Sequence, residues 1–177
     1  MTLPFVAVAA FATWGWYPAL LGVRPGPNRS LLEARQLDVQ TKPAWLAHLG
    51  EIWEEIVRTS IPSVSIDDAR WQPAQGWWGG AAVGQDCELD VVAAHRDDRT
   101  RVLVGEVKLS LGPSDVTRLL YALEQKTRSC AWARNKQLTL RLWTMRWQGR
   151  SRRPPTVIDA RELMTNWRDA TRHDARK

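Results

Sequence analysis

The spacing of apolar and polar positions along the chain predicts both helices and strands. Apolar residues recur every three or four positions after Pro43, which is helical spacing, and this pattern ends at Pro62. Short apolar runs between polar turns are typical of strands. The expected elements are a helix from Pro43, strands at 63–71, 87–94 and 101–110, a helix at 114–133, and strands at 139–147 and 156–159. This order predicts a mixed α/β fold, with a central β-sheet flanked by helices around a core of helix, three strands, helix and strand.

The length of 177 residues fits one domain with a single core, together with shorter flanking segments. We expect residues 1–42 to form an aromatic N-terminal linker segment, with a short helix at 30–40. Residues 43–165 are expected to form the main domain. Residues 166–177 are expected to be a charged tail that frays.

Residues 3–21 are apolar, but their pattern favours neither a secretion signal nor a membrane anchor. No basic stretch precedes the apolar run, and Pro4, Gly15 and Pro18 interrupt it. Cys87 and Cys130 lie far apart and outside any Cys-x-x-Cys pattern, which indicates a reducing compartment without a disulfide framework or zinc. We therefore expect a cytoplasmic protein with no membrane partner.

The balance of charges favours a polyanionic partner such as DNA. The formal net charge is +6, and arginine, whose fork suits phosphate, far outnumbers lysine. A bias in the base composition of the gene would also produce this excess, so charge alone leaves DNA binding open. Most of the eleven tryptophans are expected in the core or on flat packing surfaces. Trp77 and Trp78 are expected to cover the sheet edge rather than to stack on bases.

Charged side chains stand inside two runs that otherwise resemble buried strands. Glu88 and Asp90 lie in the first run, and Glu106 and Lys108 lie in the second. Because side chains alternate along a strand, each pair is expected on one face of the sheet. Charges are rare at strand centres unless something pairs with them. We therefore predict that these groups converge on a divalent cation.

The ligand types favour Mg²⁺ or Mn²⁺ at this position. Mg²⁺ takes oxygen ligands, usually one or two carboxylates together with waters and a substrate phosphate. Asp90 and Glu106 are the expected carboxylate ligands, and the backbone carbonyl of Val107 is a candidate further ligand. Lys108 is expected to stay protonated and to orient the attacking water or offset developing charge. These roles together are those of metal-dependent phosphodiester hydrolysis.

The spacing of these residues resembles the PD-(D/E)XK nuclease superfamily, which has the restriction-endonuclease-like fold. Residues 3–147 resemble more closely the domain of unknown function at the C-terminus of archaeal and bacterial AAA-type ATPases. Four motifs similar to those of that family occur in order: Gly50-Glu51-Ile52-Trp53-Glu54, Trp77-Trp78-Gly79, Glu88-Leu89-Asp90 and Gly105-Glu106-Val107-Lys108.

The resemblance implies a DNA endonuclease-like hydrolase. It makes Glu54 a carboxylate supplied by the helix, Asp90 and Glu106 the metal ligands, and Lys108 the catalytic lysine; Glu88 is a candidate additional ligand. The ATPase and winged-helix portions of that family have no counterpart in this sequence. An AAA-type ATPase partner is therefore expected to act in trans, unless the chain is an inert, truncated remnant. A homodimer is also compatible with the sequence.

Each of these residues also has a plainer interpretation. Glu54 can pair with Arg58 one helical turn away, and Glu88 can face solvent at a strand edge or accompany Lys108. The charges on the two strands can form a structural ion pair. The alternative function is then a catalytically inactive nuclease-fold module that binds DNA or a partner ATPase.

Overall fold

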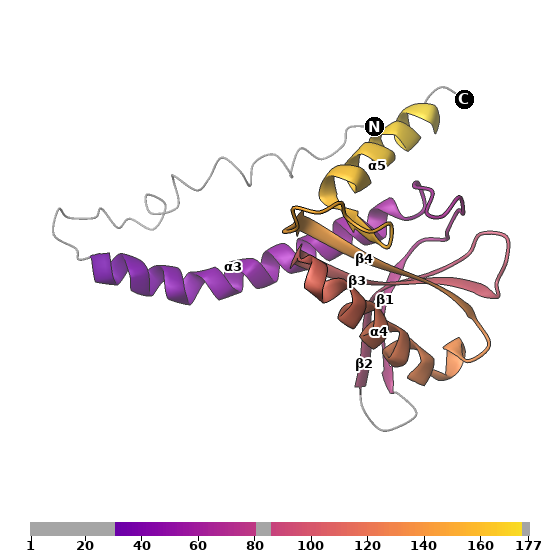
Figure 1. Ribbon diagram of the computed structural model, residues 1–177, viewed down its shortest axis with the longest axis horizontal. Helices are drawn as coiled ribbons and strands as arrows, with labels where there is room; N and C mark the ends of the chain where they lie inside the picture. Colours follow the sequence, from indigo (N-terminus) through magenta and orange to yellow (C-terminus); the bar gives the residue numbers. More distant parts are fainter. Residues whose placement is uncertain (1–30, 81–85, 175–177) are drawn as a thin grey trace. The chain divides into compact units, whose positions relative to one another are not determined.

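The computed structural model describes residues 31–80 and 86–174 (Figure 1). The chain divides into two compact units, Met1–Trp45 and Leu46–Lys177, and all packing contacts and site residues described below belong to the second unit. The elements of the described residues are α3 (Leu31–Ser60), β1 (Gln75–Gly80), β2 (Asp86–Ala94), β3 (Arg101–Leu111), α4 (Pro113–Ser129), the 3-10 turn η2 (Ala131–Ala133), β4 (Gln137–Trp147), β5 (Val157–Asp159) and α5 (Ala160–Asp174).

The described strands form one sheet in the order β1-β2-β3-β4-β5. The β1–β2 and β2–β3 pairs are antiparallel, whereas β3–β4 and β4–β5 are parallel. Helix α4 connects the parallel strands β3 and β4, which need a crossover of this kind. It begins at Pro113, where a helix needs no N–H donor, and Asp115 accepts a hydrogen bond from the Gly112 N–H at 3.1 Å. The expected mixed α/β fold, with a central sheet flanked by helices, is confirmed.

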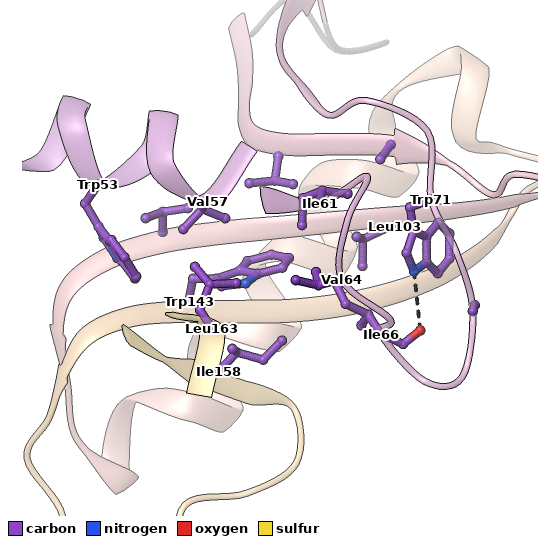
Figure 2. Packing of buried hydrophobic residues seen from close by; sticks show 14 residues of the cluster. Trp53, Val57, Ile61, Val64, Ile66, Trp71, Leu103, Trp143, Ile158 and Leu163 are labelled. Carbon is purple, nitrogen blue, oxygen red and sulfur yellow. Dashed lines mark hydrogen bonds between the residues drawn. The ribbon is translucent and has the colours of Figure 1, made fainter. Parts of the chain in front are cut away.

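One face of the sheet packs against α3, the segment that follows it, and α5; we call it the α3 face. Its cluster joins Trp53 and Val57 of α3 to Leu103 of β3, Trp143 of β4 and Leu163 of α5 (Figure 2). All five side chains are buried. Burying an apolar side chain of this kind stabilises a fold by about 1.5–3 kcal/mol. This layer therefore fixes the second half of α3 against the central strands.

The opposite face packs against α4, and we call it the α4 face (Figure 1). Its cluster contains Val116 and Leu123 of α4, Leu89 of β2, Val104 of β3 and Leu142 of β4. Because both faces are covered, residues 102–105 of β3 are buried on both sides of the sheet. The charged side chains that follow them on the same strand, Glu106 and Lys108, therefore need partners.

The strand expected at residues 63–71 is wrong. Asp67 and Asp68 have positive φ angles of 54° and 56°, and Ile66 and Ala69 exchange two backbone hydrogen bonds of 3.1 Å across them. A two-residue turn with both central φ angles positive reverses the chain, and aspartate tolerates this conformation better than most residues. The segment instead forms an irregular layer that buries its apolar residues on the α3 face.

The first strand is instead β1, in the glycine-rich stretch Gln75–Gly80. Trp77 supplies the packing that β1 needs, because it lies edge-on against Trp132 with ring centroids 6.0 Å apart. Gly79 leaves room for the Trp77 ring, which would lie 2.5 Å from a Cβ at that position. Aromatic packing therefore outweighs the weak strand propensity of glycine.

Helix boundaries also differ from the expected ones. Helix α3 is continuous through Pro43, which was expected to begin a helix. Proline removes one backbone hydrogen bond, but residues on both sides of it stay helical. The second helix ends at Ser129, before the separate turn η2, and α5 extends to Asp174 through most of the expected tail.

Among the described residues, no helix is both long enough and apolar enough to span a bilayer. The apolar segment 3–21 lies outside the described residues, so the expectation for it is untested.

Candidate active site at the divergence of two strands

Strand β2 contains a bulge at Asp90. The β1–β2 register shifts between Gln75 and Trp77. At this point two residues of β2, Asp90 and Val91, oppose the single residue Gly76 of β1. An extra residue of this kind bends the strand and re-aims its side chains, and such bulges are frequent beside active sites.

The bulge interrupts the alternation of side chains along β2. Leu89 packs on the α4 face and Val91 packs on the α3 face. A regular strand would place these two residues on the same face. The alternation that predicted a shared face for Glu88 and Asp90 therefore does not continue through Asp90.

Beside the bulge, the Asp90 side chain replaces a backbone hydrogen bond of the sheet. Regular β2–β3 pairing ends at Val91 with Gly105. The same register would place Leu89 opposite Val107, but the Val107 N–H donates to Oδ2 of Asp90 at 2.7 Å. A carboxylate is a stronger acceptor than a neutral carbonyl. This bond therefore holds the carboxylate where the two strands diverge.

The backbone carbonyl of Val107 points into the same gap. In an antiparallel pair, the N–H and C=O of one residue point toward the same neighbouring strand. The N–H of Val107 points toward β2, and so does the carbonyl of Arg101 on the same edge of β3, which accepts from the His95 N–H at 3.0 Å. The Val107 carbonyl consequently points toward β2, as the Val107 N–H does.

Glu106 and Lys108 continue the row of β3 side chains that lies on the α4 face. The Lys108 Nζ lies 2.7 Å from Oε1 of Glu106, and the Lys126 Nζ, from α4, lies 3.6 Å from Oε2. The Glu106 side chain is only 17% exposed. Two ammonium groups thus compensate a largely buried carboxylate, which would otherwise be costly.

Helix α3 contributes Glu54 and Arg58. One nitrogen of Arg58, Nη1, lies 3.3 Å from Oε2 of Glu54 and donates to the backbone carbonyl of Asp90 at 3.1 Å. The Arg58 side chain is 19% exposed. A single guanidinium therefore connects the helix, its own carboxylate and the bulge.

The charges of neighbouring side chains shift the pKa values of Asp90 and Lys108. Burial raises the pKa of the Asp90 carboxyl above its usual range; the Val107 hydrogen bond opposes the rise, and the charges of Glu106 and Glu54 add to it. Burial acts to lower the pKa of Lys108, but the bond and charge of Glu106, with Asp90 and Glu54, raise it overall. Lys108 is therefore protonated at neutral pH and cannot act there as a general base.

Four of the predicted site residues are linked by contact or by charge: Lys108 contacts Glu106, and the charges of Glu106 and Glu54 act on both Asp90 and Lys108. Glu88 does not join them, because its side chain is exposed and its charge is not among those acting on Asp90 or Lys108.

Two further residues belong to the group. The sequence analysis named Arg58 only as a helical partner of Glu54 and did not name Lys126. The contact of Arg58 with the Asp90 carbonyl and the contact of Lys126 with Glu106 have no local signal in the sequence.

The oxygen donors at the divergence suit a small divalent cation. Asp90 and Glu106 supply two carboxylates and Val107 a carbonyl, and Mg²⁺ often takes one or two carboxylates with waters. Within residues 31–80 and 86–174, no three His, Cys, Asp or Glu side chains form a group ready to hold an ion. A cation here would therefore rely on these two carboxylates, and Glu106 would exchange a lysine contact for it.

Comparisons of the chain with protein families, with curated proteins and with solved structures found no match. The function is therefore argued from the geometry of this site.

Proposed function

We propose that this chain is a metal-dependent phosphodiesterase that acts on DNA, with a restriction-endonuclease-like fold of the PD-(D/E)XK type. The observation that carries the proposal is the Asp90 carboxylate bound to the Val107 N–H at 2.7 Å, at the divergence of β2 and β3. Glu106 and Lys108 lie on the neighbouring strand, and the charges of Glu106 and of Glu54, from α3, both act on Asp90. A backbone carbonyl would serve the sheet equally well at this position, so the carboxylate of Asp90 indicates a role beyond strand pairing.

The oxygen donors named above would hold Mg²⁺ or Mn²⁺. When bound, such an ion polarises a phosphate oxygen and makes a water more acidic. Asp90 is held in position twice, through its side chain by the Val107 N–H and through its carbonyl by Arg58. Lys108 keeps its proton, so it offsets negative charge at the phosphate or orients the attacking water.

The charges of the site residues already cancel one another, so a bound phosphate would call for additional positive charge. Glu54, Asp90 and Glu106 are matched by Arg58, Lys108 and Lys126 in the protein alone. The single charge of a phosphodiester would leave this set net negative, and a divalent cation would more than offset that charge. The net charge of +6 for the whole chain favours the approach of a polyanion.

A second candidate is a catalytically inactive module of the same fold that binds DNA or an AAA-type ATPase. The observation that favours it is the double ion pair of Glu106 with Lys108 and Lys126. This pair satisfies the carboxylate without a metal, as a purely structural cluster requires.

Cleavage of supercoiled plasmid DNA with Mg²⁺ or Mn²⁺ separates the two candidates. A phosphodiesterase cleaves only with metal, and Asp90→Ala or Lys108→Ala removes cleavage while circular dichroism stays unchanged. The control is Glu51→Gln on the same helix as Glu54, because the Glu51 side chain is 79% exposed; it should cleave normally. Metal-independent cleavage, or equal cleavage by all variants, contradicts the proposal. Binding without any cleavage supports the inactive module.

A further inference from the structure

The two adjacent tryptophans of β1 have opposite environments. Trp77 packs on the α4 face against Trp132, whereas Trp78 points to the other face and is 71% exposed. Within residues 42–79 and 87–172, no other large hydrophobic side chain is so exposed. A single exposed hydrophobic side chain is common on protein surfaces, but the indole of Trp78 offers a large flat apolar face to a ligand.

The Trp78 ring rests on the backbone of its own strand. A Cβ at Gly76 would come within 3.1 Å of Cη2 and 3.4 Å of Cζ3 of this ring. The glycine therefore allows the indole to lie close to the strand while most of its surface stays open to solvent. This makes Trp78 a supported aromatic surface rather than a free side chain.

This surface lies next to the candidate active site. Gly76, which supports the ring, is the residue opposite the Asp90 bulge, and Trp78 pairs with Glu88 across β1 and β2. Glu88 is two positions from Asp90, which is about 7 Å along a strand at about 3.3 Å per residue. That separation is about one or two nucleotides of a DNA strand.

We propose that Trp78 and Glu88 form a subsite that stacks one unpaired base beside the phosphate that the Asp90 site would receive. The inference rests on the proposed function and specifies its substrate class as single-stranded or frayed DNA. Bases of a duplex are stacked on each other and cannot lie on a protein side chain without leaving the helix. The Glu88 carboxylate, directly opposite on the same face, repels phosphate and can accept hydrogen bonds from a base edge. Trp78 and Glu88 together thus favour a nucleotide base over the sugar-phosphate backbone of DNA at this position.

The test is fluorescence anisotropy with a fluorescein-labelled DNA single strand of about 12 nucleotides, and with its duplex, in EDTA so that nothing is cleaved. Trp78→Ala is expected to weaken single-strand binding about 5- to 150-fold, as the loss of one stacked base does. Duplex binding should change far less. Trp78→Phe should restore most of the single-strand affinity, because it keeps an aromatic face.

The matched control is Tyr121→Ala, which removes an exposed aromatic side chain from α4 that is 66% exposed. It should leave both affinities unchanged. Equal loss for single strand and duplex, or no loss in Trp78→Ala, would overturn the subsite.

This outcome can be separated from failure of the proposed function. Single-strand binding that depends on Trp78, without cleavage by the wild type, keeps the subsite and rejects the hydrolase. Metal-dependent cleavage whose preference for single strands does not depend on Trp78 keeps the hydrolase and rejects the subsite.

Discussion

The carboxylate of Asp90 accepts the Val107 N–H at 2.7 Å, where the sheet register would have placed the backbone carbonyl of Leu89. One side chain therefore ends the β2–β3 ladder and becomes the centre of the charged group. Burial raises the pKa of this carboxyl, which means that folding disfavours its charged form. Groups kept charged against such a cost are typical of functional sites.

Asp90→Asn is expected to raise the free energy of unfolding at neutral pH in metal-free buffer. The asparagine oxygen can still accept the Val107 N–H, while the buried charge and its repulsion by Glu106 and Glu54 disappear. Because the folded pKa lies above the ordinary value of 3.8, the wild type loses stability as the pH rises through this range. The advantage of the variant should therefore shrink toward acidic pH. Urea denaturation in EDTA at about pH 7 and about pH 4 measures both effects.

A variant that is less stable than the wild type at neutral pH would contradict this account of Asp90. Glu51→Gln serves as the control, since its exposed side chain should leave stability within about 0.5 kcal/mol.

Arg58→Met is expected to lower the free energy of unfolding by about 1.5–3 kcal/mol, the value typical of a hydrogen bond to a charged group. The change removes the donor to the Asp90 carbonyl and the partner of Glu54. Glu55→Ala is the matched control, because it removes only exposed contacts, with Arg58 and with the Thr59 hydroxyl, and should cost less than about 1 kcal/mol. Equal effects of the two variants would show that Arg58 acts only at the surface.

Gly105→Ala is expected to destabilise the protein by about 3 kcal/mol. A Cβ at this position would overlap the ring of Trp143, which is fully buried and cannot move aside. Gly50→Ala, in the exposed part of α3, should instead stabilise by about 1 kcal/mol, since a Cβ there meets nothing within 4 Å. Thermal denaturation of both variants checks the opposite signs, and a harmless Gly105→Ala would refute the close packing.

Cys87 and Cys130 are expected to be unreactive in the native protein. They are buried free thiols with sulfur atoms 3.3 Å apart, and burial together with this contact raises the pKa of Cys87 to about 11. The thiolate of Cys87, which is its reactive form, is therefore scarce at neutral pH, and burial keeps the reagent away from both sulfur atoms. Iodoacetamide should modify both thiols in urea and neither under native conditions. Rapid native modification of either thiol would count against this prediction.

The sequence predicted the order of the core elements because their periodicity and turns are local properties. It placed the first strand wrongly, because the signal for β1 is the contact of Trp77 with Trp132, more than fifty residues away. The apparent strand at 63–71 alternates well, yet two positive φ angles at Asp67 and Asp68 reverse it.

The site residues themselves were predictable, because charges at strand centres are rare enough to draw notice. Their arrangement was not. The bulge at Asp90 depends on pairing with β1, and the contacts of Arg58 and Lys126 depend on how two helices pack on opposite faces of the sheet. The opposite environments of Trp77 and Trp78 follow from strand alternation, but only once β1 is known to be a strand.

Titration with Mn²⁺, followed by the electron paramagnetic resonance signal of the free ion, tests most directly whether Asp90 and Glu106 hold a metal. The account predicts one site per chain in the wild type and in Glu51→Gln, displaced by excess Mg²⁺. Affinity should fall at least about 10-fold in Asp90→Asn. Equal binding by all three proteins, or no binding by any, would contradict a metal site at the divergence of β2 and β3.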